Sequence, residues 1–499
     1  MTSHSAFSGA SRREFLRRAA VLSGSVGTGA LPFAMNLAAM NAAAAQSGDS
    51  KAIVCLFLHG GNDAANMVLP TDAASWQAYT TVRSTGADPI ALKAVGTPRD
   101  LLAPWASPAA LGGVLPIEPG FTASPENASR GFALHPQMEA VQSLFREGRL
   151  AVVANAGPLI QPVTKAEVRA KSKPLPAKLG SHNDQQSTWQ TLAPEGAKFG
   201  WGGRLGDMLA SSNSSTVFTS ISVSGNVQFL AGQQVYQYQV GSGGALPIEG
   251  VVNTLFNSPA ATAAYRSLLT QANSPDAQPH LLAREHAVLA KRSIDAQAAF
   301  NAAFSSSTAA APTSYFSPAT RGYTANPLAA QLRTVARIIG ARGGLGVRRQ
   351  VFFVGLGGFD THDLQNRSHA ERMTQVSHAL AYFDGVLGDL GVRNQVTLFT
   401  ASDFGRTFAS NGDGTDHGWG AHHFVYGGAV KGGEIYGRFP QVGLNHDDEV
   451  GSGTFLPGIS VDQIGGTLGK WFGANDSQLD LVFPNLRNFP RDLGFMRPA

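Results

Sequence analysis

Three apolar runs, each followed within a few residues by acidic or imidazole side chains, limit what this chain can fold into. The runs are Ala52–Leu58, Val351–Leu356 and Val396–Thr400. The first is apolar at every position, as expected for a central strand of a parallel sheet whose two faces are both covered. Between the last two runs, apolar residues recur every three or four positions from Met373 to Leu390, which predicts a helix that packs on a sheet. The sequence therefore predicts an α/β fold with a doubly wound, mostly parallel sheet.

Less regular segments surround these elements. The spacing of apolar residues predicts helices at 136–147, 280–304 and 327–341, and strands at 150–155 and 424–426. Residues 216–240 alternate in polarity and are rich in Val, Thr, Tyr and Gln, which predicts antiparallel strands inserted into the main fold. Residues 305–326 are rich in Ser, Ala and Pro and are expected to form a loop. We therefore expect one domain over 46–499, with an inserted segment at about 200–326.

Asp and His gather where the predicted strands end, although charged residues are only 14% of the chain. The carboxyl ends of parallel strands meet in one crevice, which is where ligands bind in open α/β sheets. Carboxylates and neutral imidazoles are typical zinc ligands, and carboxylates also suit magnesium, calcium or manganese. The sequence thus predicts a divalent metal site, with zinc as the first expectation. The candidate ligands in these clusters are Asp360, His362, Asp403, His417, His422 and His423.

The N-terminus predicts export. Arg12 and Arg13 precede a mildly apolar stretch that ends in Ala43-Ala44-Ala45, the pattern of a twin-arginine signal peptide over residues 1–45. Cleavage there would leave 34 basic and 33 acidic residues, a formal charge of +1. Nothing in that balance suggests a nucleic-acid partner, and no apolar run is long enough for a transmembrane span. We expect a periplasmic or secreted protein.

The single cysteine, Cys55, lies within the first apolar run. One cysteine cannot form an internal disulfide, so the fold must rest on its apolar core. We expect Cys55 to be a buried strand residue that behaves as a small hydrophobe.

Taken together, these motifs resemble the bacterial family called domain of unknown function 1501. The resemblance rests on the paired arginines and on four motifs: His59-Gly-Gly-Asn-Asp63, Gly-Gly-Phe-Asp360-Thr-His362, Ser402-Asp403-Phe-Gly-Arg406-Thr and Asp416-His417-Gly-Trp-Gly-Ala-His422-His423. It implies membership of the alkaline phosphatase–sulfatase superfamily. Members hold two metals on a doubly wound sheet and attack a phosphate or sulfate ester with Ser, Thr or formylglycine.

The resemblance also implies roles for single residues. Asp63 would be the ligand after the first strand, and Asp360 with His362 would supply the next Asp and His. Asp403 takes the place of an Asp-His pair, but Phe404 stands where the histidine should be. His417, His422 or His423 would replace that histidine, and one of the last two would be the final ligand. At least one of these three is expected to orient a ligand instead of binding the metal.

Ser181 is the candidate nucleophile because it lies at the matching point in chain order, ahead of a helix-like stretch. Arg406 would either bind the anionic oxygens of an ester or pair with a carboxylate. His59 and His135 are expected to be structural.

Two function classes follow. The first is an exported metal-dependent hydrolase that acts on a small anionic ester. The second is a catalytically silent relative that binds or assembles envelope partner proteins.

Overall fold

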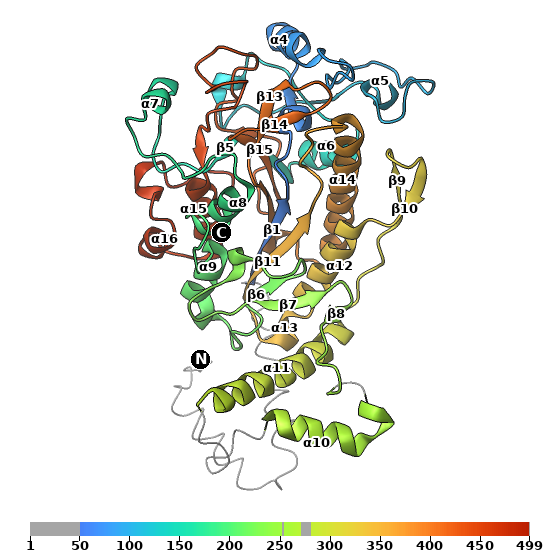
Figure 1. Cartoon of the computed structure of the whole chain (residues 1–499), viewed down its shortest axis with the longest axis vertical. Coiled ribbons are helices and arrows are strands. Elements are labelled where there is room, and N and C mark those ends of the chain that lie inside the picture. The colour runs from blue at the N-terminus through green and yellow to red at the C-terminus, as the bar shows by residue number, and fades with distance from the viewer. Residues whose placement is uncertain (1–49, 252–253, 271–280, 499) are drawn as a thin grey trace, which may run out of the picture. The chain divides into compact units, whose positions relative to one another are not determined.

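The three apolar runs form adjacent parallel strands at the centre of the main sheet (Figure 1). They are β1 (Lys51–Leu58), β11 (Arg349–Leu356) and β12 (Val396–Ser402), and β1 lies between the other two. The computed structural model describes residues 50–251, 254–270 and 281–498. The predicted signal peptide lies outside these residues. Within them, the central strands are confirmed as the sequence predicts.

Burial on both faces explains why β1 is apolar throughout. Val54, Leu56 and Leu58 enter one core cluster, and Ile53 and Phe57 enter the other. All five side chains are at most 1% exposed. Burying each of them contributes about 1.5–3 kcal/mol to folding.

Ten strands among the described residues form the main sheet, nine of them in the order β16-β5-β15-β12-β1-β11-β6-β7-β8. The pairs from β12 to β7 run parallel, whereas β15 is antiparallel to both β12 and β5. The sheet is thus mostly parallel with added antiparallel strands. Besides the three central strands, it contains β5 (Leu150–Gly157), β6 (Ser220–Ser222), β7 (Tyr238–Gly241), β8 (Gly244–Ala245), β15 (Ala421–Gly427), β16 (Ile435–Tyr436) and β17 (Ile459–Ser460).

The sequence predicts antiparallel strands at 216–240, and the predicted direction is wrong. The segment contributes only β6 and the start of β7, and these pair in parallel with each other and with β11. Their direction is set by the loop between them, which crosses over instead of turning back as a hairpin. Only β8 turns back on β7.

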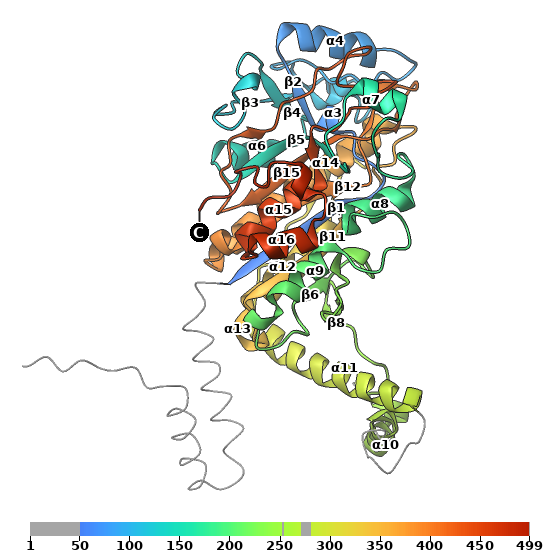
Figure 2. The ribbon, with the colours of Figure 1, turned by 90° about the vertical axis from the view of Figure 1, so that its left-hand side faces the viewer.

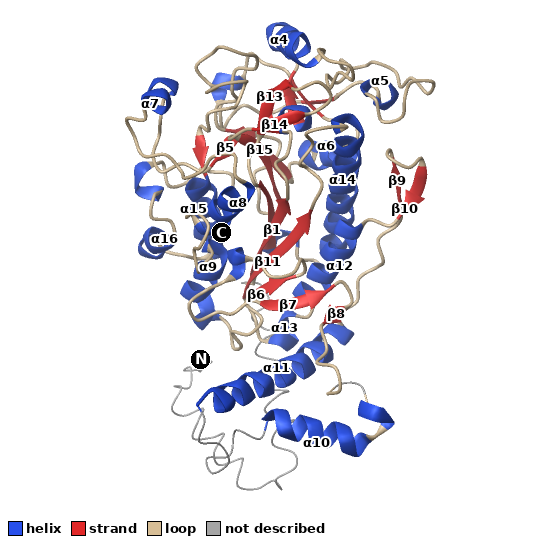
Figure 3. Cartoon of the chain, in the orientation of Figure 1, coloured by secondary structure: helices blue, strands red, loops and turns tan. Residues whose placement is uncertain are grey.

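Helices cover both faces of the sheet, as Figures 2 and 3 show. One face packs against α6, α12 and α14, and the other against α8, α9, α15 and α16. The helices are α3 (Ala64–Met67), α4 (Ala73–Arg83), α5 (Pro108–Leu111), α6 (Glu139–Arg146), α7 (Lys165–Ala170), α8 (His182–Thr191), α9 (Trp201–Leu209), α10 (Pro259–Thr270), α11 (Leu281–Ser306), α12 (Pro327–Gly340), α13 (Arg342–Leu345), α14 (Gln365–Asp389), α15 (Val461–Phe472) and α16 (Asp476–Val482). The four helices that the sequence predicts correspond to α6, α11, α12 and α14.

Short strands outside the main sheet complete the fold. The region expected to be a loop at 305–326 contains a hairpin of β9 (Tyr315–Ser317) and β10 (Gly322–Thr324). The others are β2 (Val68–Pro70), β3 (Leu115–Ile117), β4 (Phe132–Leu134), β13 (Arg406–Ser410) and β14 (Thr415–His417). Across the described part of the chain, no helix has the length and apolarity needed to cross a membrane.

Candidate metal centre

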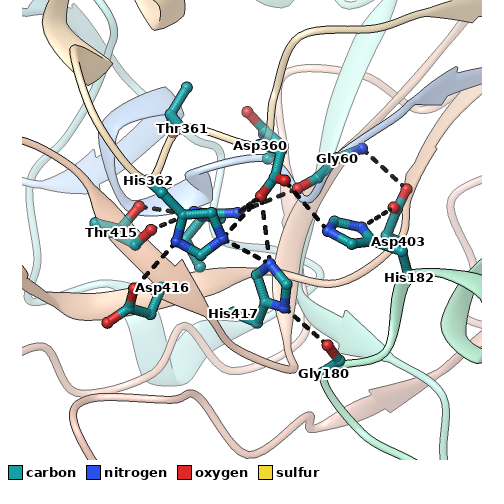
Figure 4. Close-up of polar contacts among 12 residues, drawn as sticks. Gly60, Gly180, His182, Asp360, Thr361, His362, Asp403, Thr415, Asp416 and His417 are labelled. Carbon is teal, nitrogen blue, oxygen red and sulfur yellow. Dashed lines mark hydrogen bonds and ion pairs between the residues drawn. The ribbon is translucent and has the colours of Figure 1, made fainter.

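A cluster of imidazoles and carboxylates lies beyond the carboxyl ends of β1, β11 and β12, where the sequence predicts a site (Figure 4). Asp360 follows β11, His417 ends β14 and His182 begins α8. One ligand atom from each of these three residues lies within 4.8 Å of the other two. His362 adjoins them, since its Nε2 is 2.9 Å from Nε2 of His417.

Glycines at the end of β1 allow the strands to approach this closely. Gly60 has φ +116°, and a Cβ there would lie 2.4 Å from the backbone nitrogen of Asp360. Gly61 has φ +86°, and a Cβ there would lie 2.5 Å from the Phe404 ring. Both positions therefore require glycine, because the conformation and the contact each disfavour a side chain.

Asp360 is the centre of the cluster. Its Oδ1 lies 3.2 Å from His362 Nε2 and 3.3 Å from His417 Nε2. Its Oδ2 lies 3.4 Å from His182 Nε2. Three imidazole Nε2 atoms thus face one carboxylate.

Each of these imidazoles has an oxygen partner on its other nitrogen. His417 Nδ1 is 2.7 Å from the Gly180 carbonyl oxygen, His362 Nδ1 is 3.1 Å from Asp416 Oδ1, and His182 Nδ1 is 2.6 Å from Asp403 Oδ2. An oxygen that only accepts hydrogen bonds favours a proton on Nδ1, so that in the neutral imidazole the lone pair lies on Nε2. Metal-binding histidines are oriented by the same arrangement.

The donor set fits a cation. Three Nε2 lone pairs and a carboxylate repel one another unless a proton or a metal ion lies between them. Ligands about 2.0–2.1 Å from a tetrahedral zinc ion lie about 3.3 Å from one another. The contacts of 3.2–3.4 Å between Asp360 and the three imidazoles, and of 2.9 Å between His362 and His417, are close to that spacing. Imidazoles together with one carboxylate suit zinc better than magnesium or calcium.

The environment shifts the pKa values of the cluster. The hydrogen bond to Asp403 raises the pKa of His182, whereas burial lowers the pKa of His417. Burial alone would raise the pKa of Asp360, but the hydrogen bond and charge of Arg406 outweigh it and hold this pKa below its usual value. Asp360 is therefore ionised at neutral pH, as a metal ligand must be.

Arg406 is buried and its donors are occupied within the protein. Nη1 donates to Asp360 Oδ1 at 2.6 Å and to the Gly60 carbonyl oxygen at 3.2 Å. Nε donates to Thr415 Oγ1 at 3.2 Å, and Nη2 donates to the Thr415 carbonyl oxygen. Of the two expectations for Arg406, this geometry matches pairing with a carboxylate.

Asp403 is fully buried behind His182. Its Oδ2 accepts from His182 and from Gln186 Nε2 at 2.9 Å, and its Oδ1 accepts from the Gly60 backbone N–H at 3.1 Å. The carboxylate therefore orients His182. Phe404, which directly follows Asp403, packs its ring against His182 and His417, with centroids 4.9 and 4.4 Å apart.

Asp63 is not brought into the cluster. Its two carboxylate oxygens accept from Arg83 at 2.6 and 2.9 Å, and Oδ2 also accepts from Gln365 Nε2 at 2.6 Å. The Asp63 side chain is 1% exposed and that of Arg83 is fully buried. Asp63 forms a buried ion pair under the loop that follows β1.

His422 and His423 lie within the core. His422 Nδ1 accepts from the Asn155 backbone N–H at 3.0 Å, and its ring stacks on Phe439. His423 packs against Trp189. Burial lowers the pKa of each imidazole to about 3, so both are neutral. Neither belongs to the three-residue cluster.

Ser181 is the residue just before α8, between two residues that touch the cluster. The Gly180 carbonyl oxygen lies within hydrogen-bond distance of His417 Nδ1, and His182 Nε2 faces the Asp360 carboxylate. The Ser181 hydroxyl donates to Asp184 Oδ2 at 2.9 Å. The first turn of α8 thus begins beside the cluster.

Two residues of the site are missing from the ligands that the sequence predicts. His182 belongs to the cluster, and Asp416 orients His362. The sequence could have indicated both residues, since His182 directly follows the candidate nucleophile Ser181 and Asp416 directly precedes the candidate ligand His417. Nothing in the sequence indicates the role of the Gly180 carbonyl oxygen.

Three solved structures are similar to this chain at low sequence identity. A protein of Bacteroides thetaiotaomicron, from a study of glycosaminoglycan metabolism, is 11% identical, with 90% of this chain and 79% of that chain covered and a TM-score of 0.32. A sulfatase from Pseudoalteromonas is 10% identical, with 89% and 71% covered and a TM-score of 0.33. The lipoteichoic acid synthase LtaP from Listeria monocytogenes is 7% identical, with 88% and 77% covered and a TM-score of 0.34.

No curated protein matches the sequence. The sequence does match a protein family, described as "Protein of unknown function (DUF1501)", over residues 50–459. This match includes β1 and every residue of the cluster. The chain therefore belongs to the DUF1501 family.

Proposed function

We propose that this protein is an exported metal-dependent hydrolase of phosphate or sulfate esters. One observation carries the proposal: three imidazoles, each fixed through Nδ1 by an oxygen, direct Nε2 at the Asp360 carboxylate. Arg406 balances the charge of Asp360, and the three imidazole nitrogens directed at the same carboxylate additionally favour a metal ion.

The residues that would hold the metal are His182, Asp360 and His417, with His362 beside them. A zinc ion bound there would polarise an ester oxygen and lower the pKa of a nucleophile; manganese, magnesium or calcium are alternatives. Asp403 and Asp416 keep two of the imidazoles in the required tautomer. Arg406 holds Asp360 ionised and in place.

Ser181 is the proposed nucleophile. A serine hydroxyl is unreactive at its ordinary pKa, so it must lie beside a group that activates it. Its neighbours on either side both contact the cluster. The N-terminal N–H groups of α8 would favour the anionic oxygens of a bound ester. Because the Arg406 N–H groups already donate within the protein, the N–H groups of α8 are the better candidates for binding the anionic oxygens of the ester.

The test is hydrolysis of aryl phosphates, phosphodiesters and sulfate esters by the purified chain with zinc, manganese, magnesium or calcium. Activity should require one of these metals, and Ser181→Ala should lower turnover at least about 100-fold. Ser172→Ala, in the exposed connector before α8, is the matched control and should retain full activity. If activity survives Ser181→Ala, a metal-bound water is the better nucleophile. No hydrolysis with any metal would count against the enzyme.

A second candidate function is a silent relative that binds or assembles envelope proteins. It is favoured by the positions of Asp63 and Asp403, neither of which directs a carboxylate oxygen at a shared metal position. Asp63 pairs with Arg83, and Asp403 orients His182 through its Nδ1. Only one three-residue cluster is found in the described ranges, whereas superfamily members hold two metals. Metal binding without any ester hydrolysis would support this alternative.

A further inference from the structure

A pocket lies between the loop that precedes α5 and the β9–β10 hairpin. Figure 1 shows this hairpin beside α14. It encloses about 350 Å³. Its wall is mainly apolar, with Leu101, Trp105 and Phe316, and it carries two charged residues, Asp100 and Arg321. Ligand pockets typically combine such an apolar lining with a few polar groups that fix orientation.

Helix α14 anchors both walls of this pocket. Trp105 and its neighbour Ala106 pack against Ala370. Glu371, the next residue of the helix, accepts from Ser317 Oγ at 2.6 Å and from the Tyr315 hydroxyl. The two walls are therefore held in a fixed relation.

Arg321 is held in an unusual way. Its guanidinium carbon lies 4.1 Å from the centre of the Trp105 ring, a cation–π contact. Within the described parts of the chain, its side-chain N–H groups have no hydrogen bond or ion pair. Its backbone has φ +58°, a left-handed conformation that costs a non-glycine residue about 1 kcal/mol or more. Arg321 is thus fixed in position while its donors are left free.

We infer that this pocket binds an oxyanion carried on a small aromatic or branched apolar group. The oxyanion takes the free edge of the Arg321 guanidinium, which matches carboxylate, sulfate and phosphate oxygens in pairs. The apolar body lies against Leu101 and Phe316, which are 84% and 46% exposed and gain from being covered. This site is separate from the metal cluster and does not depend on the proposed hydrolysis.

Asp100 tests whether the ligand of this pocket is an anion or a cation. Its Oδ1 accepts from the Leu102 backbone N–H at 2.9 Å, a bond that an asparagine side-chain oxygen can also accept. A bound anion is repelled by the Asp100 charge, so Asp100→Asn should tighten the binding of an anion. For a cationic ligand the same change would weaken binding.

The experiment measures binding of benzoate, benzenesulfonate and phenylphosphonate to the purified chain by calorimetry, with a chelator present to exclude metals. These probes present the three oxyanions on the same ring, and benzamide is the uncharged counterpart. We expect at least one anion to bind about tenfold or more tightly than benzamide. Arg321→Gln should weaken that binding about tenfold or more, and Asp100→Asn should tighten it.

Two matched variants complete the design. Arg99→Gln removes a nearby exposed cation that pairs with Glu139, and it should leave binding within about twofold. Asp360→Asn alters the metal cluster and should also leave binding unchanged. Equal binding of benzamide and the anions, unaltered binding in Arg321→Gln, or no binding at millimolar concentration would overturn the inference. A loss of binding in Asp360→Asn would place the anion at the metal cluster and would overturn it as well.

Discussion

At the scale of single residues, the Nδ1 partners of the histidines decide what the cluster can do. Gly180, Asp403 and Asp416 each occupy one imidazole nitrogen, so the other nitrogen faces Asp360. A ligand set oriented before the metal arrives loses little conformational freedom on binding. The cluster should therefore bind a divalent ion, and Asp360 should contribute most to its affinity.

We predict that Asp360→Asn weakens zinc binding at least about 100-fold, since the neutral amide loses the charge that balances the ion. Competition with a chromogenic chelator measures the affinity. Asp363→Asn, an exposed carboxylate three residues away, is the matched control and should bind zinc as the unaltered chain does. Equal affinities for the two variants would refute a ligand role for Asp360.

We predict a different result for Asp63. Asp63→Asn leaves Arg83 buried without its ion-pair partner, which should cost about 3–5 kcal/mol of unfolding free energy. Denaturant titration measures this loss, and zinc affinity should change less than about threefold. Asp480→Asn breaks an exposed pair with Arg491 and should cost at most about 1 kcal/mol. A large drop in zinc affinity for Asp63→Asn would restore Asp63 as a ligand.

The sequence indicates where the site lies but not which atoms form it. Asp360 follows from the rule that ligands gather where parallel strands end. His417 instead comes from β14, a short antiparallel strand outside the main sheet. His422 and His423 carry the same chemistry, but strand alternation turns them to opposite faces of β15, and both are buried. A residue pattern does not contain these directions. It also does not contain the Gly180 carbonyl, because every residue has one.

At the scale of elements, the sequence predicts best where one strong apolar pattern decides the structure. The central strands and α14 are of this kind, because their residues fill both core layers or one continuous stripe. The parallel pairing of β6 and β7 depends on the path of the loop that joins them, which leaves little trace in composition. The β9–β10 hairpin is held by Glu371 on a distant helix, so its own Ser- and Pro-rich sequence does not indicate it.

Helix α15 carries a buried acid whose charge opposes folding at neutral pH. Asp462 is 2% exposed, and burial raises its pKa to about 6, although the Asn485 backbone N–H donates to it. A carboxyl with a raised folded-state pKa stabilises the fold at low pH. That contribution is lost as pH rises from about 4 to about 6.

We predict that Asp462→Asn abolishes the loss of stability that the buried Asp462 carboxyl causes as pH rises. Relative to the unaltered chain, the variant should gain up to about 3 kcal/mol of unfolding free energy between pH 4 and pH 7. Denaturant midpoints at several pH values measure the effect. Asp476→Asn, in the exposed first turn of α16, should show no such gain. A variant that is no more stable than the unaltered chain at pH 7 would contradict the buried-acid account.

At the scale of the whole molecule, the export prediction concerns residues outside those described. We predict that residues 1–50, fused to a folded reporter, direct it out of the cytoplasm. Because the pathway recognises the arginine pair, Arg12→Lys combined with Arg13→Lys should abolish export. Fractionation of cells measures the reporter. Continued export in a strain without the twin-arginine translocase would show that another pathway operates.

Metal binding should also stabilise the folded chain as a unit. Its ligands come from α8, from the loop after β11 and from β14, which lie far apart in sequence and meet only in the folded state. An ion that binds the folded state alone adds about 2.7 kcal/mol at a free concentration 100 times its dissociation constant. We therefore predict that a chelator lowers the melting temperature and that equimolar zinc restores it.

The stoichiometry of this effect tests the number of metals. The described residues offer one cluster, so the melting temperature should approach its plateau at one zinc per chain. Asp360→Asn should melt at the same temperature with and without the chelator, whereas Asp63→Asn should melt lower but still respond to zinc. A plateau at two zinc ions per chain would require a second set of ligands, and Asp63 or Asp403 would then have to leave its present hydrogen bonds to supply it.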